Sequence, residues 1–379
     1  MGISPLKFYN TLTENGIRFF TGVPDSTLRN FCLCLEKNVA EQNHIIAANE
    51  GNAIAIATGY YLGTGKLPMV YMQNAGFGNA VNPLLSLCDP TVYAIPMLVL
   101  IGWRGEPGIK DEPQHIKQGE VQIQLLESLG ISFDIVSKHE QNIDRIIETA
   151  INVTLNKSSP FVILVRKGTF DTNEATSTNL VHGEITREES LEMIVNHLPD
   201  DSIIVSTTGK TSREIYEIRE KNNEPHFKDF LTVGSMGHCS SIALGITIAK
   251  PSVRVICIDG DGALIMHMGS IPTIGKVRPK NLIHILINNG VHDSVGGQRT
   301  VADIINFRDF VLSNNYRNYE KASTKKELGR VLQKSIQLPG PTFIDVIVKL
   351  GTRENLGRPK ITPKVMKDLL MNFLHKGIL

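Results

Sequence analysis

The sequence predicts an α/β protein of two doubly wound domains, each built around a parallel β-sheet. Strand-like apolar runs alternate with helix-like segments from Gly16 to Arg166, and again from Thr186 to about Leu350. Such alternation is typical of parallel sheets that are covered by helices on both faces. Between the two blocks, residues 167–185 are rich in threonine, asparagine and charged side chains, as expected of an interdomain linker.

Length and composition agree with this class. A chain of 379 residues suits two domains, and a hydrophobic content of 41% is ample for two ordinary cores. The net charge of +1 gives no indication of a nucleic-acid or membrane-surface partner. The five cysteines are scattered without a metal-ligand spacing, which predicts reduced thiols in a cytoplasmic protein. We find no signal peptide and no apolar run of membrane-spanning length.

The first block divides into elements at its turn and cap residues. Asp25 suits the N-cap of a helix, and Gly63 with Gly65 should close a later one. The expected strands span 16–24, 44–49, 67–73, 94–103, 131–137 and 160–166. The expected helices span 26–38, 50–65, 119–130 and 144–156, with a loop and helix over 74–88 and a loop over 104–118. At the far end of the chain, residues 362–379 have helical periodicity and either cap the second domain or dock on a neighbour.

The second block contains the stretch that carries the chemistry. One apolar run, 255–258, ends in the glycine and acidic residues 259–262, and a second run, 282–287, ends in two asparagines. Open α/β sheets bind ligands at such strand ends. The glycines allow the backbone to approach a phosphate, and the helix after Gly262 can direct N–H groups at an anion. Asp261 and Asn289 supply oxygen ligands that suit Mg²⁺ bridged to a diphosphate.

This stretch resembles the thiamine diphosphate (ThDP) motif of the ThDP-dependent decarboxylases and synthases. The resemblance implies that Asp261, Asn289 and the main-chain carbonyl of Val291 bind the metal. It also implies that the diphosphate lies against Gly260, Gly262, Ala263 and Asn289. The expected fold is then a pyrimidine-binding domain over 1–166, a linker over 167–185 and a diphosphate-binding domain over 186–379, with no central domain.

Other segments match further parts of the family pattern. Glu50 can be read as a helix-start glutamate, but its segment resembles the one whose glutamate hydrogen-bonds N1′ of the aminopyrimidine. Gly234 and Met236 match a glycine carbonyl that receives the 4′-amino group and an apolar residue that holds the cofactor bent. Thr208 and Gly209 follow another strand and could donate to the diphosphate, although this is not a P-loop.

Polar, glycine-bearing loops follow strands at 22–26, 102–107, 111–115 and 291–298. They resemble the loops of family members that act on 3-phosphonopyruvate. This resemblance implies decarboxylation to phosphonoacetaldehyde and CO₂ through a ThDP ylid, in phosphonate biosynthesis. Sulfopyruvate or another 2-oxoacid is the alternative substrate. The candidates for holding a phosphonate are Arg104, Lys110, Lys117 and Arg299, and each can also be a solvated surface charge.

Three residues are candidates for handling or orienting a proton. These are Asp25, His115 and His292, where histidine is considered because it can titrate near neutral pH. A lone histidine is more often structural. In the family the two domain types meet between subunits, so the resemblance also implies a homodimer or higher homo-oligomer with active sites between chains.

The sequence argues against two other classes of function. A regulator with a degenerate cofactor site would be expected to lack Glu50, Asp261 or Asn289, and all three are present. A nicotinamide dehydrogenase should carry a Gly-x-Gly-x-x-Gly turn, and the nearest match, Gly76-Phe77-Gly78, has Val81 in place of the third glycine.

Overall fold

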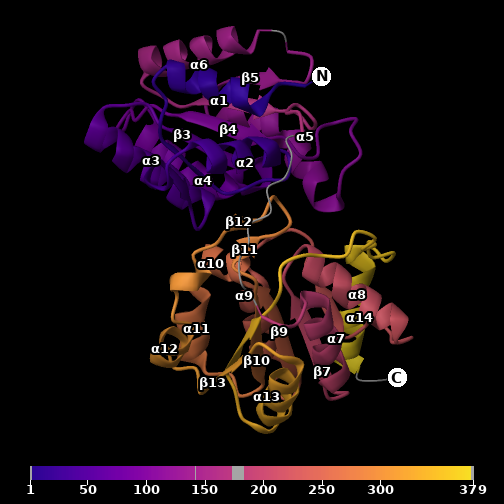
Figure 1. The fold of residues 1–379 in the computed structure, drawn as a ribbon. Coiled ribbons are helices and arrows are strands. Elements are labelled where there is room, and N and C mark those ends of the chain that lie inside the picture. Colours follow the sequence, from indigo (N-terminus) through magenta and orange to yellow (C-terminus); the bar gives the residue numbers. More distant parts are fainter. Residues whose placement is uncertain (1, 141, 173–182, 377–379) are drawn as a thin grey trace. The chain divides into compact units, whose positions relative to one another are not determined.

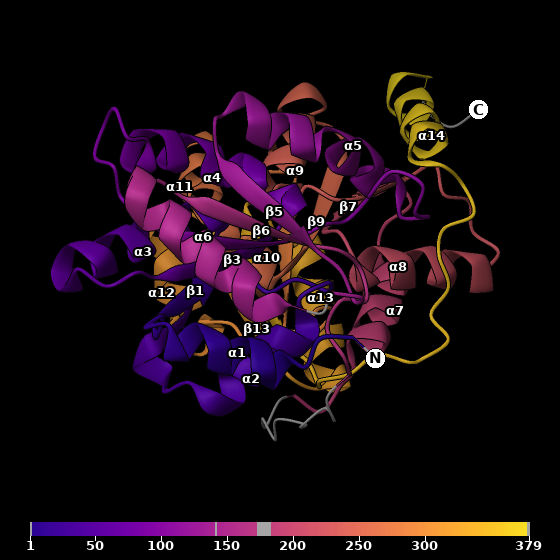
Figure 2. The same ribbon diagram turned by 90° about the horizontal axis from the view of Figure 1, so that it is seen from above.

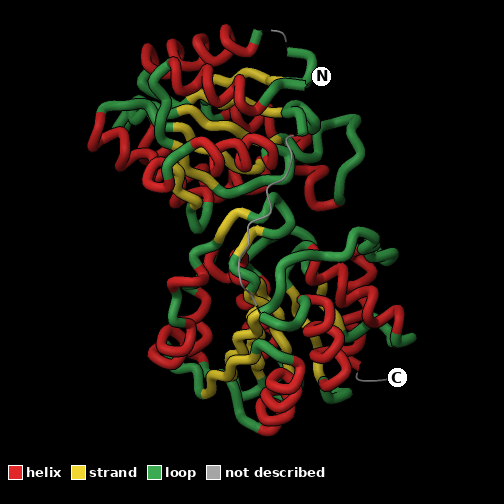
Figure 3. The backbone as a smooth tube through the Cα atoms, in the orientation of Figure 1, coloured by secondary structure: helices red, strands yellow, loops and turns green. Residues whose placement is uncertain are grey.

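The computed structural model describes residues 2–140, 142–172 and 183–376. The chain divides into unit 1, Met1–Ser177 with Ser294–Arg299, and unit 2, Thr178–Asp293 with Thr300–Leu379. In each unit the strands of a sheet lie between helices (Figure 1, Figure 3). Of the predicted linker, residues 173–182 lie outside the described residues.

Within its described part, unit 1 has a six-stranded sheet in the order β2-β1-β3-β4-β6-β5, with every printed pairing parallel. The strands are β1 (Phe20–Gly22), β2 (His44–Ile46), β3 (Met69–Gln73), β4 (Leu98–Gly102), β5 (Ser132–Val136) and β6 (Phe161–Val165). The helices are α1 (Pro5–Glu14), α2 (Arg29–Asn38), α3 (Glu50–Thr64), α4 (Phe77–Pro83), α5 (Pro113–Ser128) and α6 (Ile143–Lys157). Short helical turns are η1 (Glu41–Asn43), η2 (Asn74–Gly76) and η3 (Leu84–Cys88).

Two apolar cores cover the two faces of this sheet. One is formed with α1, α2 and α6, and the other with α3, α4 and α5. Figure 2 shows α1 and α2 on one side of the sheet and α4 and α5 on the other. Central strands such as β4 are buried along their whole length, as expected for a parallel sheet covered on both faces.

Unit 2 repeats this plan. Its described residues form a six-stranded sheet in the order β13-β14-β10-β9-β7-β8, again parallel. The strands of this sheet are β7 (Ser202–Ser206), β8 (Asp229–Leu231), β9 (Arg254–Gly260), β10 (Leu282–Asn288), β13 (Asn318–Ala322) and β14 (Thr342–Ile347). The short strand β11 (Val291–His292) also belongs to unit 2, whereas β12 (Gln298–Arg299) belongs to unit 1. The helices are α7 (Arg187–His197), α8 (Lys210–Lys221), α9 (Cys239–Ala249), α10 (Asp261–Met266), α11 (Ser270–Val277), η4 (Ala302–Ile304), α12 (Phe307–Ser313), α13 (Lys325–Gln337) and α14 (Pro363–Lys376).

The cores of unit 2 explain the place of the last helix. One core is formed with α7, α8 and α13, and the other with α9 to α12. Met366 of α14 lies in the first core and Leu370 in the second. Helix α14 therefore caps its own unit at the edge strand β8, which is the first of the two roles that the sequence allowed for residues 362–379.

The predicted fold class is confirmed, but several element boundaries are wrong. Helix α1 was not predicted, although Ser4 accepts a hydrogen bond at its N-cap and Pro5 occupies its first position. The strand expected over 16–24 is only three residues long. Gly63 lies inside α3, and Gly65 alone ends that helix in a left-handed conformation with φ 66°.

Two corrections affect the site directly. Helix α2 begins at Arg29, and the carboxylate of Asp25 instead accepts from Thr27 N and Leu28 N in the turn before it. Helix α5 begins at Pro113, so His115 and Lys117 lie on a helix and not in the predicted loop. Proline favours the first helical position, which is the signal that the loop assignment overlooked.

The five cysteines are all free and buried, in agreement with reduced thiols. Among the residues that the structure describes, no helix is long and apolar enough to cross a membrane.

Candidate active site

Polar side chains in unit 1 gather at the carboxyl ends of four neighbouring strands. Glu50 follows β2, Asp25 follows β1, Gln73 ends β3 and Arg104 follows β4. Because the strands are parallel and adjacent in the order β2-β1-β3-β4, these residues share one edge of the sheet.

Glu50 is held in a narrow, buried position. It is the first residue of α3 and is 4% exposed. Asn79 Nδ2 donates to Glu50 Oε2 over 2.7 Å, and a Cβ atom at Gly76 would collide with Oε1. Burial raises the pKa of Glu50, while the hydrogen bond from Asn79 opposes the rise. A fixed carboxyl group with a raised pKa is suited to sharing a proton with a nitrogen base.

Asp25 is fully buried beside β3 and β4. Gln73 Nε2 donates to Asp25 Oδ1, and Thr27 N donates to Oδ2 over 2.8 Å. A side chain at Gly102 would collide with Oδ2, so glycine is required there. Burial raises the pKa of Asp25, and its hydrogen bonds and the charge of Arg104 act in the opposite direction.

Arg104 is the best organised of the four predicted substrate cations. Its guanidinium group binds Asp111 through both Nε, at 2.7 Å from Oδ2, and Nη2, and its Nη1 donates to Ser26 Oγ over 2.9 Å. Its backbone is fixed as well, because Arg104 N donates to Asn74 Oδ1 and Asn74 Nδ2 donates to Arg104 O. The Arg104 side chain is 17% exposed, so it borders solvent without being free in it.

The other three cations are different. Lys110 and Arg299 are exposed. Lys117 is exposed on α5 and pairs with Glu120 over 2.8 Å. These are the properties of solvated surface charges, the alternative interpretation of each residue.

His115 lies near Arg104 but does not titrate as expected. It is 8% exposed, and its Nδ1 has no hydrogen-bond partner among the described residues. Burial, and then the charge of Arg104, lowers the pKa of His115 to about 4. The expectation that this histidine changes charge near neutral pH is therefore wrong, although its place in the site is not affected.

In unit 2, four segments predicted to bind the cofactor also follow neighbouring strands. Residues 207–209 follow β7, 234–236 lie beyond β8, 260–263 span the end of β9 and 289–291 follow β10. The sheet order β10-β9-β7-β8 places all four along one edge. The structure thus brings together residues that are up to 84 positions apart in the sequence, between 207 and 291.

Asp261 and Asn289 fit a metal-ion site. They are 3% and 7% exposed, and Thr300 Oγ1 donates to Asp261 Oδ2 over 2.6 Å. Burial raises the pKa of Asp261 to about 6, opposed by the Thr300 hydroxyl and by backbone N–H groups that include that of Asn289. Val291 is also buried, and its N–H donates to Asn289 Oδ1 over 3.1 Å. A buried carboxylate stabilised only by neutral donors, with an amide oxygen close by, is a donor set that suits Mg²⁺.

The neighbouring turns have backbone conformations and donor groups that could hold a diphosphate. Gly209, with φ 94°, precedes α8 and has a backbone conformation that favours glycine. Gly234 N donates to Thr208 Oγ1 over 2.9 Å, which joins two of the four segments. The buried hydroxyl of Thr207 has no hydrogen-bond partner among the described residues, so a donor remains available beside Gly260.

Met236 and His292 lie close to the same turn. Met236 is half-buried, and a side chain at its neighbour Gly237 would collide with His267 and Ala263. A side chain at Gly262 would meet the imidazole ring of His292. Burial lowers the pKa of His292 to about 4, so this histidine too is neutral near pH 7, contrary to expectation.

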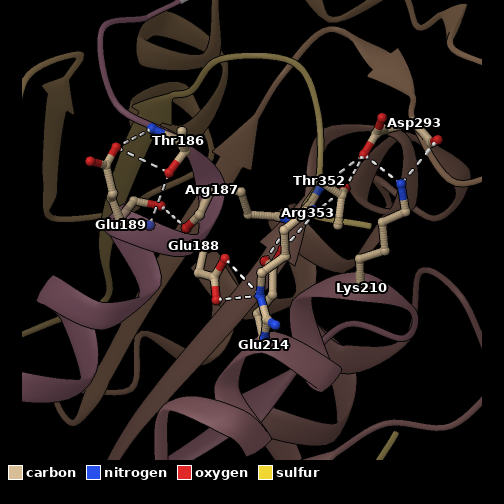
Figure 4. A network of polar contacts seen from close by, with 10 residues as sticks. Thr186, Arg187, Glu188, Glu189, Lys210, Glu214, Asp293, Thr352 and Arg353 are labelled. Carbon is tan, nitrogen blue, oxygen red and sulfur yellow. Dashed lines mark hydrogen bonds and ion pairs between the residues drawn. The ribbon is translucent and has the colours of Figure 1, made fainter. Parts of the chain in front are cut away.

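A network of charged groups holds the loop that follows Val291 (Figure 4). Asp293 Oδ2 accepts from Lys210 Nζ over 3.0 Å, from Thr352 Oγ1 over 2.9 Å and from Arg187 Nη1 over 3.2 Å. Arg187 also pairs through two nitrogens with Glu214. Although burial alone would raise the pKa of Asp293, the hydrogen bonds and charges of Lys210, Thr352 and Arg187 hold it below its ordinary value. The loop that follows the predicted metal ligand Val291 is thereby tied to the start of α8.

Several residues of this site were missed from the sequence. Gln73, Asn79 and Thr300 donate hydrogen bonds to the predicted residues Asp25, Glu50 and Asp261. Gln73 could have been found, because it is the polar last residue of a strand. Asn79 and Thr300 contact partners 29 and 39 positions away, and no local pattern signals such a contact.

The fold and the site define an enzyme that uses ThDP. Residues 7–126 match the N-terminal TPP-binding domain of thiamine pyrophosphate enzymes, and residues 207–346 match their C-terminal TPP-binding domain, where thiamine pyrophosphate is another name for ThDP. The chain is 32% identical over 367 residues to a phosphonopyruvate decarboxylase of Streptomyces viridochromogenes, covering 93% of this chain and 90% of that one. The chain belongs to the thiamine pyrophosphate enzyme family, and within it to the ThDP-dependent decarboxylases.

Sulfopyruvate decarboxylases are also similar. That of Methanosarcina acetivorans is 28% identical over 380 residues, which covers 94% of this chain and 93% of that one. The beta subunit from Methanothermobacter thermautotrophicus is 31% identical over 49% of this chain and 96% of its own length. The alpha subunit from Methanococcus maripaludis is 32% identical over 41% of this chain and 90% of its own length.

Proposed function

We propose that this enzyme decarboxylates 3-phosphonopyruvate to phosphonoacetaldehyde and CO₂. The observation that carries this proposal is Arg104, a half-buried guanidinium group positioned by Asp111, Ser26 and Asn74 at the carboxyl edge of the sheet. Arginine suits a phosphonate because its paired N–H groups match two anionic oxygens. The similarity to phosphonopyruvate decarboxylase over 93% of the chain supports the same substrate.

The cofactor is proposed to bind through residues of both units. Asp261, Asn289 and the carbonyl of Val291 would hold Mg²⁺, and Glu50 with Met236 would hold the pyrimidine ring. The diphosphate and pyrimidine would be bound further by Thr208, Gly209, Gly234, Gly260, Gly262 and Ala263. When bound, ThDP supplies an electron sink for the pair left behind as CO₂ departs.

The chain's own residues would then control protons and charge. Glu50, with its raised pKa, shares a proton with N1′ of the pyrimidine. Asp25, a fully buried carboxyl group with a raised pKa, delivers the proton that replaces CO₂ at the substrate carbon. His115 and His292, both neutral near pH 7, orient the reacting groups by hydrogen bonds. The C–C bond to the carboxylate breaks, one proton is gained, and the aldehyde leaves.

The experiment compares 3-phosphonopyruvate with sulfopyruvate and pyruvate. Wild-type enzyme with Mg²⁺ and ThDP should show its highest kcat/KM for 3-phosphonopyruvate, measured as aldehyde formed. Arg104→Ala should lower this value by about 100-fold or more, since a charge-assisted contact to the substrate contributes roughly 1.5–3 kcal/mol and Arg104 would make two. Lys117→Ala is the matched control, and its kcat/KM should be unchanged. A higher kcat/KM for sulfopyruvate would establish the second candidate, which the similarity to sulfopyruvate decarboxylases favours.

We further propose that each active site is shared between two chains. Glu50 belongs to unit 1, whereas Asp261 and Asn289 belong to unit 2. The alpha and beta subunits of sulfopyruvate decarboxylase are separate chains that each match less than half of this one. This supports a plan in which the two kinds of domain associate across a subunit interface, and a two-fold dimer would then contain two sites.

Mixing two inactive variants tests the shared site. Glu50→Gln and Asp261→Ala should each be nearly inactive. In a mixed dimer one site carries both defects and the other neither, so random exchange should restore up to about a quarter of wild-type activity. Native mass spectrometry first confirms that chains have exchanged. Mixed dimers that stay inactive would show that both groups act within one chain.

A further inference from the structure

A cluster of potential metal ligands lies in the core of unit 2, behind the turn that carries Asp261. Cys257 and Asp259 are two positions apart on β9 and so point to the same face of the sheet. His284 on β10 is paired with Cys257 in the parallel register. Cys239, the first residue of α9, covers this face. Helix and strands thus bring together four side chains of the types that bind transition metals.

All four side chains are buried, with exposed fractions of 1% for Cys239 and 0% for the other three. The Sγ atoms of Cys239 and Cys257 are 3.9 Å apart. One ligand atom each of Cys239, Cys257 and Asp259 lie within 4.8 Å of one another, and His284 Nε2 lies 3.5 Å from Asp259 Oδ2.

Two of these separations match those between ligand atoms of a tetrahedral zinc ion. Zinc–sulfur bonds of about 2.3 Å place two tetrahedral sulfur atoms about 3.8 Å apart, and bonds of about 2.0–2.1 Å place nitrogen and oxygen about 3.3 Å apart. The two printed separations, 3.9 Å between the sulfurs and 3.5 Å between nitrogen and oxygen, are each close to these values.

Asp259 and His284 each have one polar atom with a hydrogen-bond partner outside the cluster and one polar atom without a hydrogen bond to a described residue. Asp259 Oδ1 accepts from Gly260 N over 2.9 Å, and His284 Nδ1 lies 3.1 Å from the hydroxyl of Tyr316. Asp259 Oδ2 and His284 Nε2 make no hydrogen bond to any described residue. A carboxylate oxygen that faces a ring nitrogen in a buried site needs a proton or a metal ion between the two atoms. A proton would serve this pair alone, whereas a metal ion would also engage both sulfurs.

We propose that Cys239, Cys257, Asp259 and His284 bind a zinc ion that is distinct from the Mg²⁺ expected at Asp261. Thiolate and imidazole ligands select zinc, whereas Mg²⁺ prefers oxygen ligands alone. Four protein ligands leave no open position, so the ion is structural. It would fasten α9 to β9 and β10 directly behind the turn that holds the cofactor. The hydrogen bond of Tyr316 to the other ring nitrogen is the contact that commonly orients a metal-binding histidine.

Metal analysis of purified full-length protein tests the site. After growth with zinc and exhaustive desalting, wild type should contain about one zinc per chain, as a closed structural site requires. Cys239→Ala and Cys257→Ala should each lose the zinc. Cys88→Ala is the matched control, since Cys88 is equally buried but lies in unit 1, and it should keep the zinc. Asp261→Ala should also keep it, which separates this site from the cofactor site whatever the substrate of the enzyme.

A cobalt spectrum provides the second measurement. Wild type loaded with Co²⁺ should show the thiolate-to-cobalt absorption of a tetrahedral site, and Cys239→Ser should weaken that absorption while keeping the size of the side chain. This variant is used if the alanine variants do not fold, as judged by circular dichroism. The proposal would be overturned if purified wild type contained no stoichiometric zinc and also failed to take up Zn²⁺ or Co²⁺ on refolding. Zinc that persists in both cysteine variants would overturn it too, because the ion would then lie elsewhere.

Discussion

Replacing Asp261 by asparagine is expected to stabilise the metal-free protein at alkaline pH and to remove its response to Mg²⁺. Burial raises the pKa of Asp261 from 3.8 to about 6. At about 1.4 kcal/mol per pH unit, keeping this carboxylate ionised in the folded state costs about 3 kcal/mol. The protonated group contributes full stability below about pH 4, and this is lost as the pH rises through about 6.

Asparagine avoids this cost but accepts fewer of the surrounding N–H and O–H groups. One lost hydrogen bond offsets about 1 kcal/mol, which leaves a net gain of about 2 kcal/mol. For a domain of the size of unit 2 this corresponds to a rise in Tm of roughly 4–8 °C.

The assay is thermal unfolding with EDTA at about pH 8 and about pH 4, followed by addition of Mg²⁺ and ThDP. Asp261→Asn should have the higher Tm at the alkaline pH only, and Mg²⁺ with ThDP should raise the Tm of wild type alone. Asp303→Asn, a change at an exposed carboxylate, is the control. The reasoning would be refuted if the Tm of Asp261→Asn were at or below that of wild type at both pH values and if Mg²⁺ with ThDP raised the Tm of the variant as much as that of wild type.

Three further outcomes are expected. Glu50→Gln should still bind ThDP, because Asn79 can donate to the amide oxygen. The variant should exchange the C2 proton of the cofactor slowly in deuterated buffer. Exchange at the wild-type rate would contradict the role assigned to Glu50. Asp293→Asn should weaken ThDP binding by roughly 10-fold or more in titrations, since it removes the carboxylate that ties Lys210 to the loop proposed to bind the metal. An unchanged affinity would show that other contacts hold this loop. His115→Gln should keep the shape of the wild-type pH profile of kcat/KM between about pH 5.5 and 8, because burial lowers the pKa of His115 to about 4. If the variant lost an inflection that wild type shows near about pH 6.5, His115 would titrate there and the lowered pKa would be wrong.

Much of the candidate site could be predicted because its residues stand at fixed places in the chain. In α/β folds the ligand site lies at the carboxyl ends of the strands. Four predicted residues follow or end an apolar run, so their position at the strand ends could be predicted without any knowledge of packing. They are Asp25, Glu50, Asp261 and Asn289. The boundaries were less reliable, as α1 and the early start of α5 show, because caps and tertiary contacts set them and periodicity does not.

The sequence alone determined the fold class, the two-domain plan and the cofactor, since these depend on the order of strands, helices and strand-end residues along the chain. Only the tertiary structure distinguished Arg104, fixed by Asp111, from the exposed Lys110 and Arg299, because the environment of a cation depends on what packs around it. The same holds for the lowered pKa of His115, which burial determines. It holds for the proposed zinc ligands as well, since only the register of β9 and β10 and the packing of α9 bring scattered cysteines beside a histidine.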